Sequence, residues 1–386
     1  MDEKDGLILG IDLQEETAQV CFYNDKLNIP QAAPGENGSV VIPNHKRLSQ
    51  CMTEYDEESH FEDLLSMIAI LIEYGKKSAG RMRISQICIC LDPFIADLLE
   101  MVDRVMDRLQ YSKEQYEIIS RPEAFAYYAY SQKKELYSAG TVLLDLNQNG
   151  LTAYRMSSFR KNGMDFIHED REDFQSDSLR SAGKKEAGIE EVCEELCTDI
   201  EELMKGKTAS TMYLTGKGFD YDKLPEKLTK TICNRRKAFL GQNLYVKGAC
   251  YCARERQFPK VFDNLILDCE NRIQYGIETD IVERGQKRRL RIVRPGMNWF
   301  ESERKLDFIL EDERMLTFIL TDANGVVREE KLDISDIPFR SGKTTRICVH
   351  VQYTATDRCM ITVKDKGFGQ FVKSSGKVFY LEINFT

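Results

Sequence analysis

The sequence contains no long hydrophobic run, and this absence limits where the protein can work. No stretch approaches the roughly eighteen consecutive apolar residues that a membrane-spanning helix needs. The first six residues, MDEKDG, are acidic, whereas a secretory signal starts with a basic segment. We therefore expect a cytoplasmic protein that has no membrane as a partner.

The chain also lacks an excess of positive charge. It carries 54 Lys and Arg against 63 Asp and Glu, which gives a net charge of −9. A protein that binds nucleic acid needs cations to neutralise phosphates, so nucleic acid is not an expected partner. Two short basic runs, residues 234–237 (NRRK) and 287–291 (KRRLR), are interpreted as solvated surface.

Metal-ligand spacing is absent although cysteine is plentiful. Among 12 cysteines and 4 histidines, no set has the paired spacing of a zinc ribbon. Cys88 and Cys90 lie two apart in an apolar strand, and Cys193 and Cys197 lie four apart in an expected helix, so each pair shares one face. These thiols are interpreted as buried and reduced.

What the sequence does contain is an alternation of helical and strand patterns over its first two thirds. Helical apolar spacing is found in residues 61–80, 96–110, 122–132, 189–206 and 244–256. Strand-like runs cover residues 84–94, 116–120 and 211–215, and two strand pairs cover 8–25 and 141–156. Residues 168–188 are interpreted as a polar connecting stretch. The alternation is typical of a layered α/β domain.

The pattern changes near residue 262. Strand-like runs follow one another at residues 306–310, 316–322, 346–354 and 359–365, with a turn signal at Ala323-Asn324-Gly325. Helical spacing almost disappears, which predicts a separate all-β domain. A chain of 386 residues is long enough for two or three domains with their own cores.

Two segments of the α/β part place an aspartate in an apolar strand that opens a hairpin, Gly10-Ile11-Asp12-Leu13 and Asp145-Leu146. They resemble the starts of the two phosphate-binding hairpins of the DnaK-type heat-shock chaperones, which belong to the superfamily of actin and the sugar kinases. Leu214-Thr215-Gly216-Lys217-Gly218 resembles their adenosine-binding turn. Gly248-Ala249 matches the helix that ends their ATPase domain, and IISRPEAFAYYAY at residues 118–130 resembles another conserved family segment.

The resemblance continues into the second part of the chain. Residues 263–280 resemble the leucine-rich interdomain linker and the first β-strands after it, and residues 334–369 resemble the chaperone β-domain. The resemblance implies an α/β actin-like ATPase fold with duplicated ribonuclease-H-like subdomains in residues 1–261. It implies a hydrophobic linker in residues 262–270 and a β-sandwich resembling the substrate-binding β-domain in residues 271–386.

Several departures from the family pattern concern the ATPase chemistry. Gln14-Glu15-Glu16 and Asn147-Gln148-Asn149 replace the glycine-rich hairpin turns, and Arg121 stands where the family carries a glutamate that positions metal and water. No equivalent of the catalytic lysine is evident. The outer subdomains are expected to be reduced, and because the sequence stops at Thr386 the helical lid is expected to be missing.

The resemblance implies a vestigial nucleotide site that would hold ATP or ADP with Mg²⁺. Its candidate residues are Asp12, Asp145, Gly150, Thr215, Gly216 and Gly218, with Asp12 and Asp145 as the metal pair if nucleotide binds. An Asp after an apolar strand can equally start a turn, and a turn glycine needs no ligand.

Charge at the first hairpin opposes nucleotide binding. A carboxylate about 4 Å from a phosphate oxygen costs about 4 kcal/mol at an effective dielectric constant near 20. Since about 1.4 kcal/mol is tenfold in affinity, one such contact from Glu15 or Glu16 removes ordinary ATP binding. This repulsion applies only if the side chain of Glu15 or Glu16 faces the phosphate position. From the altered hairpins we expect that no cofactor is bound.

The β-domain resemblance implies a protein or peptide client. Met297, Trp299 and Phe300 are candidate client-binding residues because an aromatic group near a loop can anchor a partner, although the same residues suit a sandwich core. The linker residues are Leu265, Ile266, Leu267 and Asp268. In the chaperones this segment docks on the ATPase domain, and here it can instead join two domains permanently.

Three functions are therefore compared. The first is a degenerate DnaK-like protein that binds or scaffolds other proteins with weak or no ATPase activity. The second is an active ATP-dependent chaperone with unusual phosphate loops, and the third is an actin-like assembly scaffold. The altered hairpins and Arg121 count against the second, and the chaperone-like β-domain counts against the third.

Overall fold

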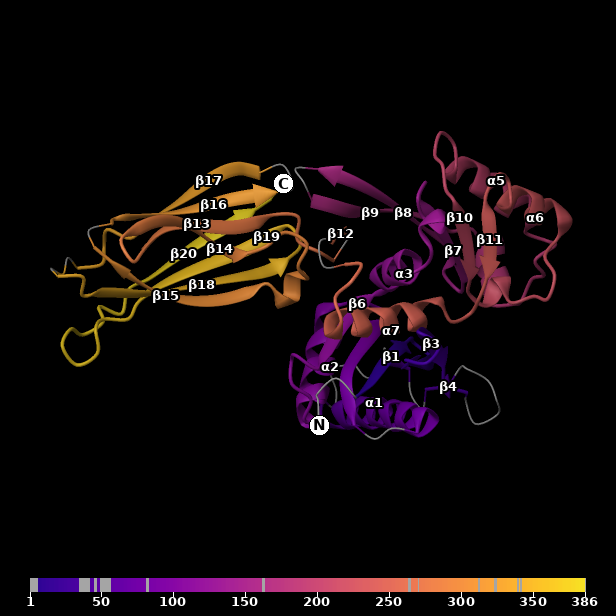
Figure 1. Cartoon of the computed structure of the whole chain (residues 1–386), viewed down its shortest axis with the longest axis horizontal. Helices are drawn as coiled ribbons and strands as arrows, with labels where there is room; N and C mark the ends of the chain where they lie inside the picture. Colours follow the sequence, from indigo (N-terminus) through magenta and orange to yellow (C-terminus); the bar gives the residue numbers. More distant parts are fainter. Residues whose placement is uncertain are drawn as a thin grey trace. The chain divides into compact units, whose positions relative to one another are not determined.

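The computed structural model describes most of the chain and divides it into two compact units (Figure 1). The first unit is Met1–Ser158 with Ile167–Leu265, and the second is Phe159–Phe166 with Ile266–Thr386. The described residues are 6–34, 42–44, 47–48, 57–80, 83–161, 164–262, 265–269, 271–311, 313–322, 325–338, 340 and 342–385.

The first sheet of unit 1 has the strand order β3-β2-β1-β5-β6, with β4 paired to β2. β1 and β2 form an antiparallel hairpin, whereas β1, β5 and β6 run parallel. Every residue of β1 is buried, which explains its continuous apolar run. The strands are β1 (Leu7–Leu13), β2 (Thr17–Asn24), β3 (Ile29–Ala32), β4 (Ile42–Pro43), β5 (Ile84–Leu91) and β6 (Tyr116–Ser120).

Helices cover this first sheet on both faces. α1 (Glu57–Ala79) and α7 (Leu244–Gln257) both contact β1 and lie on opposite sides of the sheet, and α2 (Ala96–Arg108) packs on α1 (Figure 1). The close approach of α7 depends on Gly10, because a Cβ there would lie 2.4 Å from the backbone nitrogen of Cys250. The Gly10 match to the chaperone hairpin thus has a packing reason of its own.

A second sheet has the order β11-β10-β7-β8-β9-β12; β7, β10 and β11 lie in unit 1, whereas β12 from Ile266 on is grouped with unit 2. The strand β7 pairs with its hairpin partner β8 on one side and with the parallel strand β10 on the other, as β1 pairs with β2 and with the parallel strand β5. The five strands β9-β8-β7-β10-β11 therefore repeat the arrangement of β3-β2-β1-β5-β6. The strands are β7 (Thr141–Asn147), β8 (Gly150–Lys161), β9 (Met164–Phe174), β10 (Thr211–Thr215), β11 (Lys237–Leu240) and β12 (Leu265–Asp268).

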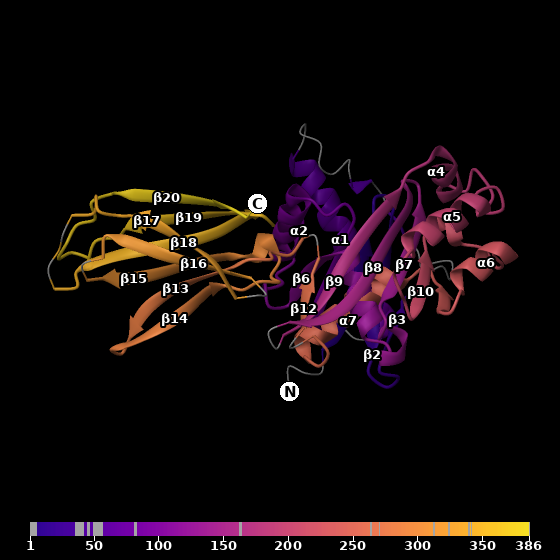
Figure 2. The same cartoon turned by 90° about the horizontal axis from the view of Figure 1, so that it is seen from above.

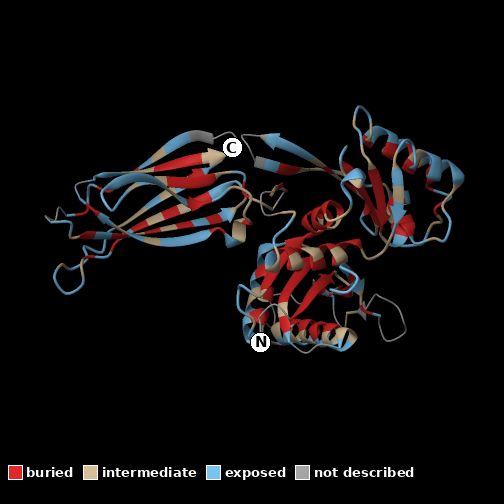
Figure 3. Cartoon of the chain, in the orientation of Figure 1, coloured by how far each residue is buried: buried red, intermediate tan, exposed pale blue. Residues whose placement is uncertain are grey.

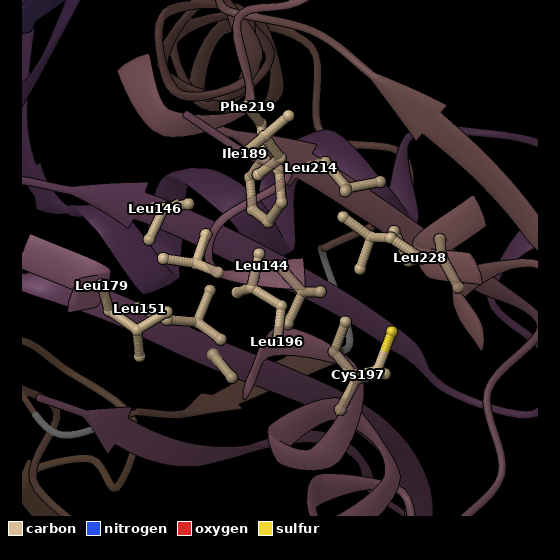
Figure 4. Close-up of a cluster of buried hydrophobic side chains, with 14 of the residues drawn as sticks. Leu144, Leu146, Leu151, Leu179, Ile189, Leu196, Cys197, Leu214, Phe219 and Leu228 are labelled. Carbon is tan, nitrogen blue, oxygen red and sulfur yellow. The ribbon is translucent and has the colours of Figure 1, made fainter. Parts of the chain in front are cut away.

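Three helices pack against the second sheet and enclose its core (Figures 2 and 4). They are α4 (Asp177–Gly183), α5 (Cys193–Leu203) and α6 (Glu226–Ile232). Leu144 and Leu146 of β7, Leu196 of α5 and Leu228 of α6 are buried in one cluster. No further subdomain is inserted between β7 and β10 in the described residues, since only β8, β9, α4 and α5 lie there.

Interpreting residues 168–188 as a connecting stretch was wrong, because β9 continues to Phe174 and α4 follows it. The apolar alternation of a strand is weak here since residues 168–173 are all exposed or half-buried. Polar side-chain pairs connect β8 and β9 instead of apolar contacts. Nη1 of Arg155 lies 2.8 Å from Oδ2 of Asp170, and the hydroxyl of Thr152 donates to Oδ1 of Asp173 at 2.7 Å.

α3 (Arg121–Tyr130) lies beside α7 between the two sheets (Figure 1). The two helices meet closely at Gly248, where a Cβ would lie 1.9 Å from the carbonyl oxygen of Ala124. Phe125 of α3 makes an edge contact with Tyr213 of β10, with ring centroids 5.8 Å apart. The helix pair therefore joins the halves of unit 1.

The start of α3 is fixed by a capping box. The backbone N–H of Ser120 donates to the buried carboxylate of Glu123 at 2.7 Å, and the Ser120 hydroxyl donates to the same oxygen at 3.0 Å. Pro122 occupies the first turn, where its missing N–H costs nothing. Arg121 is thereby held at the first helical position, directly after β6.

Unit 2 contains two four-stranded sheets that share one core. Their orders are β14-β13-β16-β17 and β15-β18-β19-β20. Buried residues from both, such as Ile277, Phe318, Val349 and Ile361, belong to a single cluster (Figure 3). The strands are β13 (Gly276–Glu283), β14 (Gln286–Val293), β15 (Glu303–Leu310), β16 (Met315–Asp322), β17 (Gly325–Asp333), β18 (Thr345–Ala355), β19 (Arg358–Asp365) and β20 (Val378–Asn384).

Some expected features need brief comment. No helix of the described residues has the length and hydropathy to cross a membrane. Cys88, Cys90, Cys193 and Cys197 are free and buried, as their spacing predicted. Ala323 and Asn324 of the expected turn lie outside the described residues. Residues 159–161 of β8 and 164–166 of β9, expected in the first domain, are grouped with unit 2.

Candidate functional site

The two candidate aspartates occupy corresponding places in the two sheets of unit 1. Asp12 lies near the end of β1 and Asp145 near the end of β7, and both side chains are buried, at 1% and 3% exposure. A charged carboxylate in such a place needs a partner, because burial disfavours the ionised form.

Arg121 supplies that partner for Asp145. Its Nη1 lies 3.2 Å from Oδ2 of Asp145 and 3.0 Å from Oδ2 of Asp92, the residue that follows β5. Since the N-terminal end of α3 is fixed by the capping box, the guanidinium is directed into the space between the two carboxylates. One internal cation thus links carboxylates that follow strands of different sheets.

Tyr245, on the first turn of α7, completes the contacts of Asp145. Its hydroxyl donates to Oδ2 of Asp145 at 2.8 Å, and the guanidinium carbon of Arg121 lies 4.9 Å from the centroid of its ring. Burial, followed by the charge of Asp145, raises the pKa of Tyr245 well above its ordinary value, so the phenol stays a donor. Oδ2 of Asp145 therefore accepts from two side chains.

Asp12 has a different environment. Nε2 of Gln14 donates to its Oδ2 at 2.7 Å, whereas Oδ1 is buried and has no hydrogen-bond partner among the described residues. Burial raises the pKa of Asp12 to about 6, against the lowering effects of Arg121 and of the Gln14 hydrogen bond. Within the described part of the chain, no group of three or more His, Cys, Asp or Glu side chains is arranged to hold a metal ion.

The first hairpin turn is closed and occupied by its own side chains. The Gln14 N–H donates to the Thr17 carbonyl at 2.9 Å, and Glu16 forms an ion pair with Arg47 at 2.6 Å. The carbonyl of Glu15 accepts from the N–H of Leu48 at 3.1 Å. The side chain aimed at Asp12 is thus the amide of Gln14, and Glu16 is engaged with Arg47.

The second hairpin turn is stabilised within itself. Oδ1 of Asn147 accepts from the N–H of Asn149 at 2.8 Å, which is the hydrogen bond of an Asx turn. Gly150 has φ = 104°, and a Cβ there would lie 2.5 Å from the carbonyl oxygen of Phe174. Packing against the end of β9 therefore accounts for this glycine.

The expected adenosine turn lies against Asp145. Thr215 is buried and pairs in register with Asp145 across β10 and β7. At Gly216, where φ is 93°, a Cβ would lie 2.3 Å from the Leu146 carbonyl oxygen and 2.6 Å from Oδ1 of Asp145. At Gly218 a Cβ would lie 2.4 Å from Cγ of Leu146. Both glycines are required by packing in this fold.

Gln242 links this turn to the first hairpin. Its Nε2 donates to the carbonyl oxygen of Gly216 at 3.0 Å, and its own carbonyl accepts from Nε2 of Gln19 on β2 at 2.8 Å. Together with Arg121, this bridge ties the two halves of unit 1 at the ends of their central strands.

The client-binding candidates of unit 2 lie beside its core. Met297 and Trp299 are half-buried and pack against the shared cluster, and Trp299 makes an edge contact with Phe300 at 5.8 Å between centroids. Phe371, which the sequence analysis did not select, is 92% exposed and is the most exposed large hydrophobic residue described. No periodic pattern marks a single aromatic in a loop, so sequence offered no signal for it.

The linker residues form strand β12 and do not cross an open gap. Leu267 is buried, and Leu265, Ile266 and Asp268 are half-buried. In unit 2, Ile266, Leu267 and Asp268 line a pocket of about 170 Å³ together with Phe159 and Phe166, whose rings stack at 5.2 Å.

Two residues of the Asp145 cluster were not identified from sequence. Asp92 comes directly after the apolar parallel strand β5, and Asp12 and Asp145 lie near the ends of the apolar strands β1 and β7. Asp92 could therefore have been selected from sequence by its position. Tyr245 carried no such signal, because a tyrosine at the start of a helix is unremarkable until the fold brings it 2.8 Å from Asp145.

Two family models match the chain from residue 45 onward. Residues 45–270 match a model described as family of unknown function (DUF5716) C-terminal, which is more than half of the chain. The chain belongs to this family. Residues 272–385 match a second model, domain of unknown function (DUF8552), and the two matches meet where β12 ends.

Two solved structures that are similar to this DUF5716 member are a sugar kinase and an ethanolamine utilization protein. The inorganic polyphosphate/ATP-glucomannokinase of Arthrobacter sp. strain KM is 10% identical, with a TM-score of 0.42 over 66% of this chain and 100% of its own. The ethanolamine utilization protein EutJ of Carboxydothermus hydrogenoformans is 12% identical, with a TM-score of 0.39 over 64% and 89%. The curated proteins contain no match.

Proposed function

We propose that this chain is a degenerate member of the actin-like ATPase superfamily, DnaK-like in its domain order, that binds or scaffolds a protein client without ATP turnover. The observation that carries the proposal is the position of Arg121, which pairs with Asp145 at 3.2 Å and with Asp92 at 3.0 Å. The superfamily assignment is supported by the shared strand order of the two sheets and by an aspartate at the end of each first strand.

The described residues do not fit a magnesium ion between Asp12 and Asp145. Magnesium requires near-octahedral oxygen ligands, mostly waters, around a small ion. Oδ2 of Asp145 already accepts from Arg121 and Tyr245, and a guanidinium beside a divalent cation is repelled by it. We infer that the arginine charge performs the neutralising role that a metal would perform.

The two hairpins support the same proposal. A phosphate would need backbone N–H groups of a glycine-rich turn to face it. Here the Gln14 amide is aimed at Asp12, and Asn147 binds the backbone of its own turn. Each hairpin keeps its strands and fills the turn with side chains that complete the local hydrogen bonding.

Contacts across unit 1 support a nucleotide-independent state. In an ATPase of this superfamily the ligand would lie between the halves, whereas Arg121 and Gln242 here bridge them directly. These bridges stabilise one arrangement of the halves without a ligand. A binding or scaffolding role needs no cycle between arrangements, so the proposal is consistent with this rigidity.

Unit 2 is the proposed client-binding part. Phe371 exposes nearly its whole side chain, and Tyr380 is also exposed. An exposed aromatic residue on an ordered domain is a typical anchor for a protein partner. We propose Phe371, in addition to the half-buried Trp299 and Phe300, as a client contact.

The proposal is tested by isothermal titration of ATP and ADP into the full chain, with and without magnesium. We expect no magnesium-dependent binding and no ATP hydrolysis. The Glu15→Gly, Glu16→Thr double variant should behave in the same way, because Arg121 and Gln14 remain in place. Micromolar binding that requires magnesium, with turnover abolished by Asp145→Asn, would overturn the proposal and favour an active ATP-dependent chaperone.

A further inference from the structure

Three residues of the basic run at 234–237, Asn234, Arg235 and Arg236, line a pocket in unit 1, and the run is largely exposed, as interpreted from sequence. The pocket has a volume of about 620 Å³ and lies among the end of α5, the following loop, α6 and the turn after it. Small-molecule sites typically occupy about 300–1,000 Å³, so its size suits a metabolite. The pocket lies at the other end of β10 from Asp145, because Thr215 pairs with Asp145 and Thr208 precedes the strand.

Arg236 is the central residue of this pocket. Its Nε donates to the carbonyl of Asn234 at 2.9 Å, whereas Nη1 is buried and has no hydrogen-bond partner among the described residues. A buried charged donor without an acceptor is unfavourable, and burial lowers the pKa of Arg236 accordingly. An anion bound in the pocket would favour the charged form of this guanidinium.

The turn that carries the arginines is held in place by its backbone. The N–H of Arg236 donates to the Cys233 carbonyl at 3.3 Å, and the N–H of Lys237 donates to the Ser210 carbonyl at 3.0 Å. Arg235 is exposed and adopts φ = 57°, a left-handed conformation that non-glycine residues rarely adopt. The two guanidinium groups are thus presented by a fixed turn at the pocket rim.

The remaining polar lining can supply further donors. Lys207 and Lys230 already form ion pairs, with Glu172 at 2.8 Å and with Glu226 at 2.7 Å. The hydroxyl groups of Thr208 and Thr231 and the amide of Asn234 complete the set, and Glu201 is the acid on the lining. The two guanidinium groups and the neutral donors can together donate more hydrogen bonds than the two oxygens of one carboxylate can accept. A phosphate group offers three terminal oxygens and more negative charge.

We propose that this pocket is a binding site for a phosphate group, either free phosphate or a phosphorylated small molecule, with Arg235 and Arg236 as its main ligands. The site is separate from the Asp12 and Asp145 cluster and does not depend on nucleotide chemistry there. Ile200 and Met204 form the apolar part of the lining, which would contact the carbon skeleton of a phosphate ester.

The test is isothermal titration of inorganic phosphate and of glycerol 3-phosphate into the full chain without magnesium, with acetate and glycerol as comparison ligands. We expect both phosphates to bind and the comparison ligands not to bind. Arg236→Gln and Arg235→Gln should each weaken phosphate binding by about tenfold or more, the usual value of a charge-assisted hydrogen bond. Glu201→Gln should strengthen it by removing a negative charge from the lining.

Arg288→Gln is the matched control, because Arg288 is an exposed arginine on β14 that pairs with Glu283 at 2.8 Å outside this pocket. It should leave phosphate binding unchanged. If Arg236→Gln fails to fold, as its circular dichroism would show, the exposed Arg235 provides the same test. Absence of phosphate binding by the natural protein, or equal loss in Arg288→Gln and Arg235→Gln, would overturn the proposal.

Affinity then distinguishes the two sources of the phosphate. Tighter binding of glycerol 3-phosphate than of phosphate assigns the site to a phosphate ester, and equal or weaker binding assigns it to free phosphate. ATP that binds without magnesium and is lost in Arg235→Gln would belong to this pocket. Failure of the phosphate-site proposal is therefore distinguishable from failure of the proposed function, because the proposed function concerns only magnesium-dependent nucleotide binding.

Discussion

Arg121 lies against the ring of Tyr245, with its guanidinium carbon 4.9 Å from the ring centroid, and both residues donate to the same oxygen of Asp145. This arrangement gives the buried carboxylate a cation and a neutral donor supplied by the two helices between the sheets. The carboxylate therefore has a structural use without any ligand, and several measurable consequences follow.

Replacing Arg121 with alanine should strongly destabilise unit 1. The change leaves Asp145 buried without its cation, and breaking a buried ion pair typically costs about 3–5 kcal/mol. The helices α1 to α7 all belong to unit 1, so urea unfolding followed by helical circular dichroism measures the effect.

Arg180→Ala is the control for that measurement. Arg180 pairs with Asp177 at 3.0 Å on the solvent-facing side of α4, where such pairs contribute no more than about 1 kcal/mol. If the two alanine variants lost similar stability, the ion pair of Arg121 would not have the role assigned to it.

Asp12→Asn should change the pH dependence of stability. The pKa of Asp12 is about 6 in the folded protein against an ordinary value of 3.8, so the folded state binds more protons between these values. The free energy of unfolding of the natural protein therefore falls as pH rises from about 4 to about 6. Asparagine does not ionise, so the free energy of unfolding of the variant does not fall in this way. Above pH 6 the variant should be more stable than the natural protein by up to about 3 kcal/mol.

The measurement is urea unfolding at several pH values on both sides of that range. The advantage of Asp12→Asn should shrink toward pH 4 and vanish below the ordinary pKa of 3.8, where the carboxyl of the natural protein is protonated in both the folded and the unfolded state. A difference between the two proteins that stays constant with pH would show that Asp12 is not titrating in the folded state.

Gly216→Ala should be far more destabilising than Gly206→Ala. Both glycines have positive φ, 93° and 71°, but a Cβ at Gly216 would meet Leu146 and Asp145 whereas nothing lies within 4 Å at Gly206. Backbone strain alone costs about 1 kcal/mol, and a clash with fixed backbone adds about 2 kcal/mol or more. Equal losses for the two variants, measured by circular dichroism, would mean that the turn can move away from Asp145.

In unit 2, Arg340→Gln should cost about 3–5 kcal/mol at neutral pH, because it removes the cation from a fully buried carboxylate. Nη1 and Nη2 of Arg340 lie 2.7 and 2.6 Å from the two oxygens of Asp365, and the N–H groups of Gly367 and Ser375 donate to the same carboxylate. Trp299 is the one tryptophan of the chain and lies in unit 2, so its fluorescence follows the unfolding.

Acid should remove the contribution of this pair. The hydrogen bonds from Arg340 and Ser375 hold the pKa of Asp365 below its ordinary value, so the carboxylate stabilises unit 2 above about pH 4 and loses this effect as pH falls through the lowered pKa. Arg346→Gln, at an exposed pair with Asp307, should cost less than about 1 kcal/mol. A larger loss for Arg346→Gln than for Arg340→Gln would contradict this explanation.

Local chemistry made much of the fold predictable. The hairpin β1–β2, the helix α3 with Pro122 in its first turn, and the buried strand β5 each follow from patterns within a few residues. β9 was missed because its residues 168–173 are exposed or half-buried and pair through charges, which carry no apolar period.

The candidate site was predictable only in part. Asp12 and Asp145 could be selected because their segments resemble the two phosphate hairpins of the family, yet their partners depend on contacts between distant parts of the chain. Tyr245 is 100 residues from Asp145 along the sequence, and Arg121 is 24 residues away. The sequence could mark Arg121 as a departure from the family pattern, but only the fold reveals which carboxylates it neutralises.

The most direct test of the central proposal, that Arg121 takes the place of a metal ion, is a titration with Mn²⁺ followed by the electron paramagnetic resonance signal of the free ion. With the natural protein and ADP we expect the free-ion signal to equal that of the same Mn²⁺ and ADP without protein. With Arg121→Ala we expect it to fall further, because Asp92 and Asp145 are left without their cation. Binding of Mn²⁺ by the natural protein that is lost in Asp145→Asn would contradict the proposal.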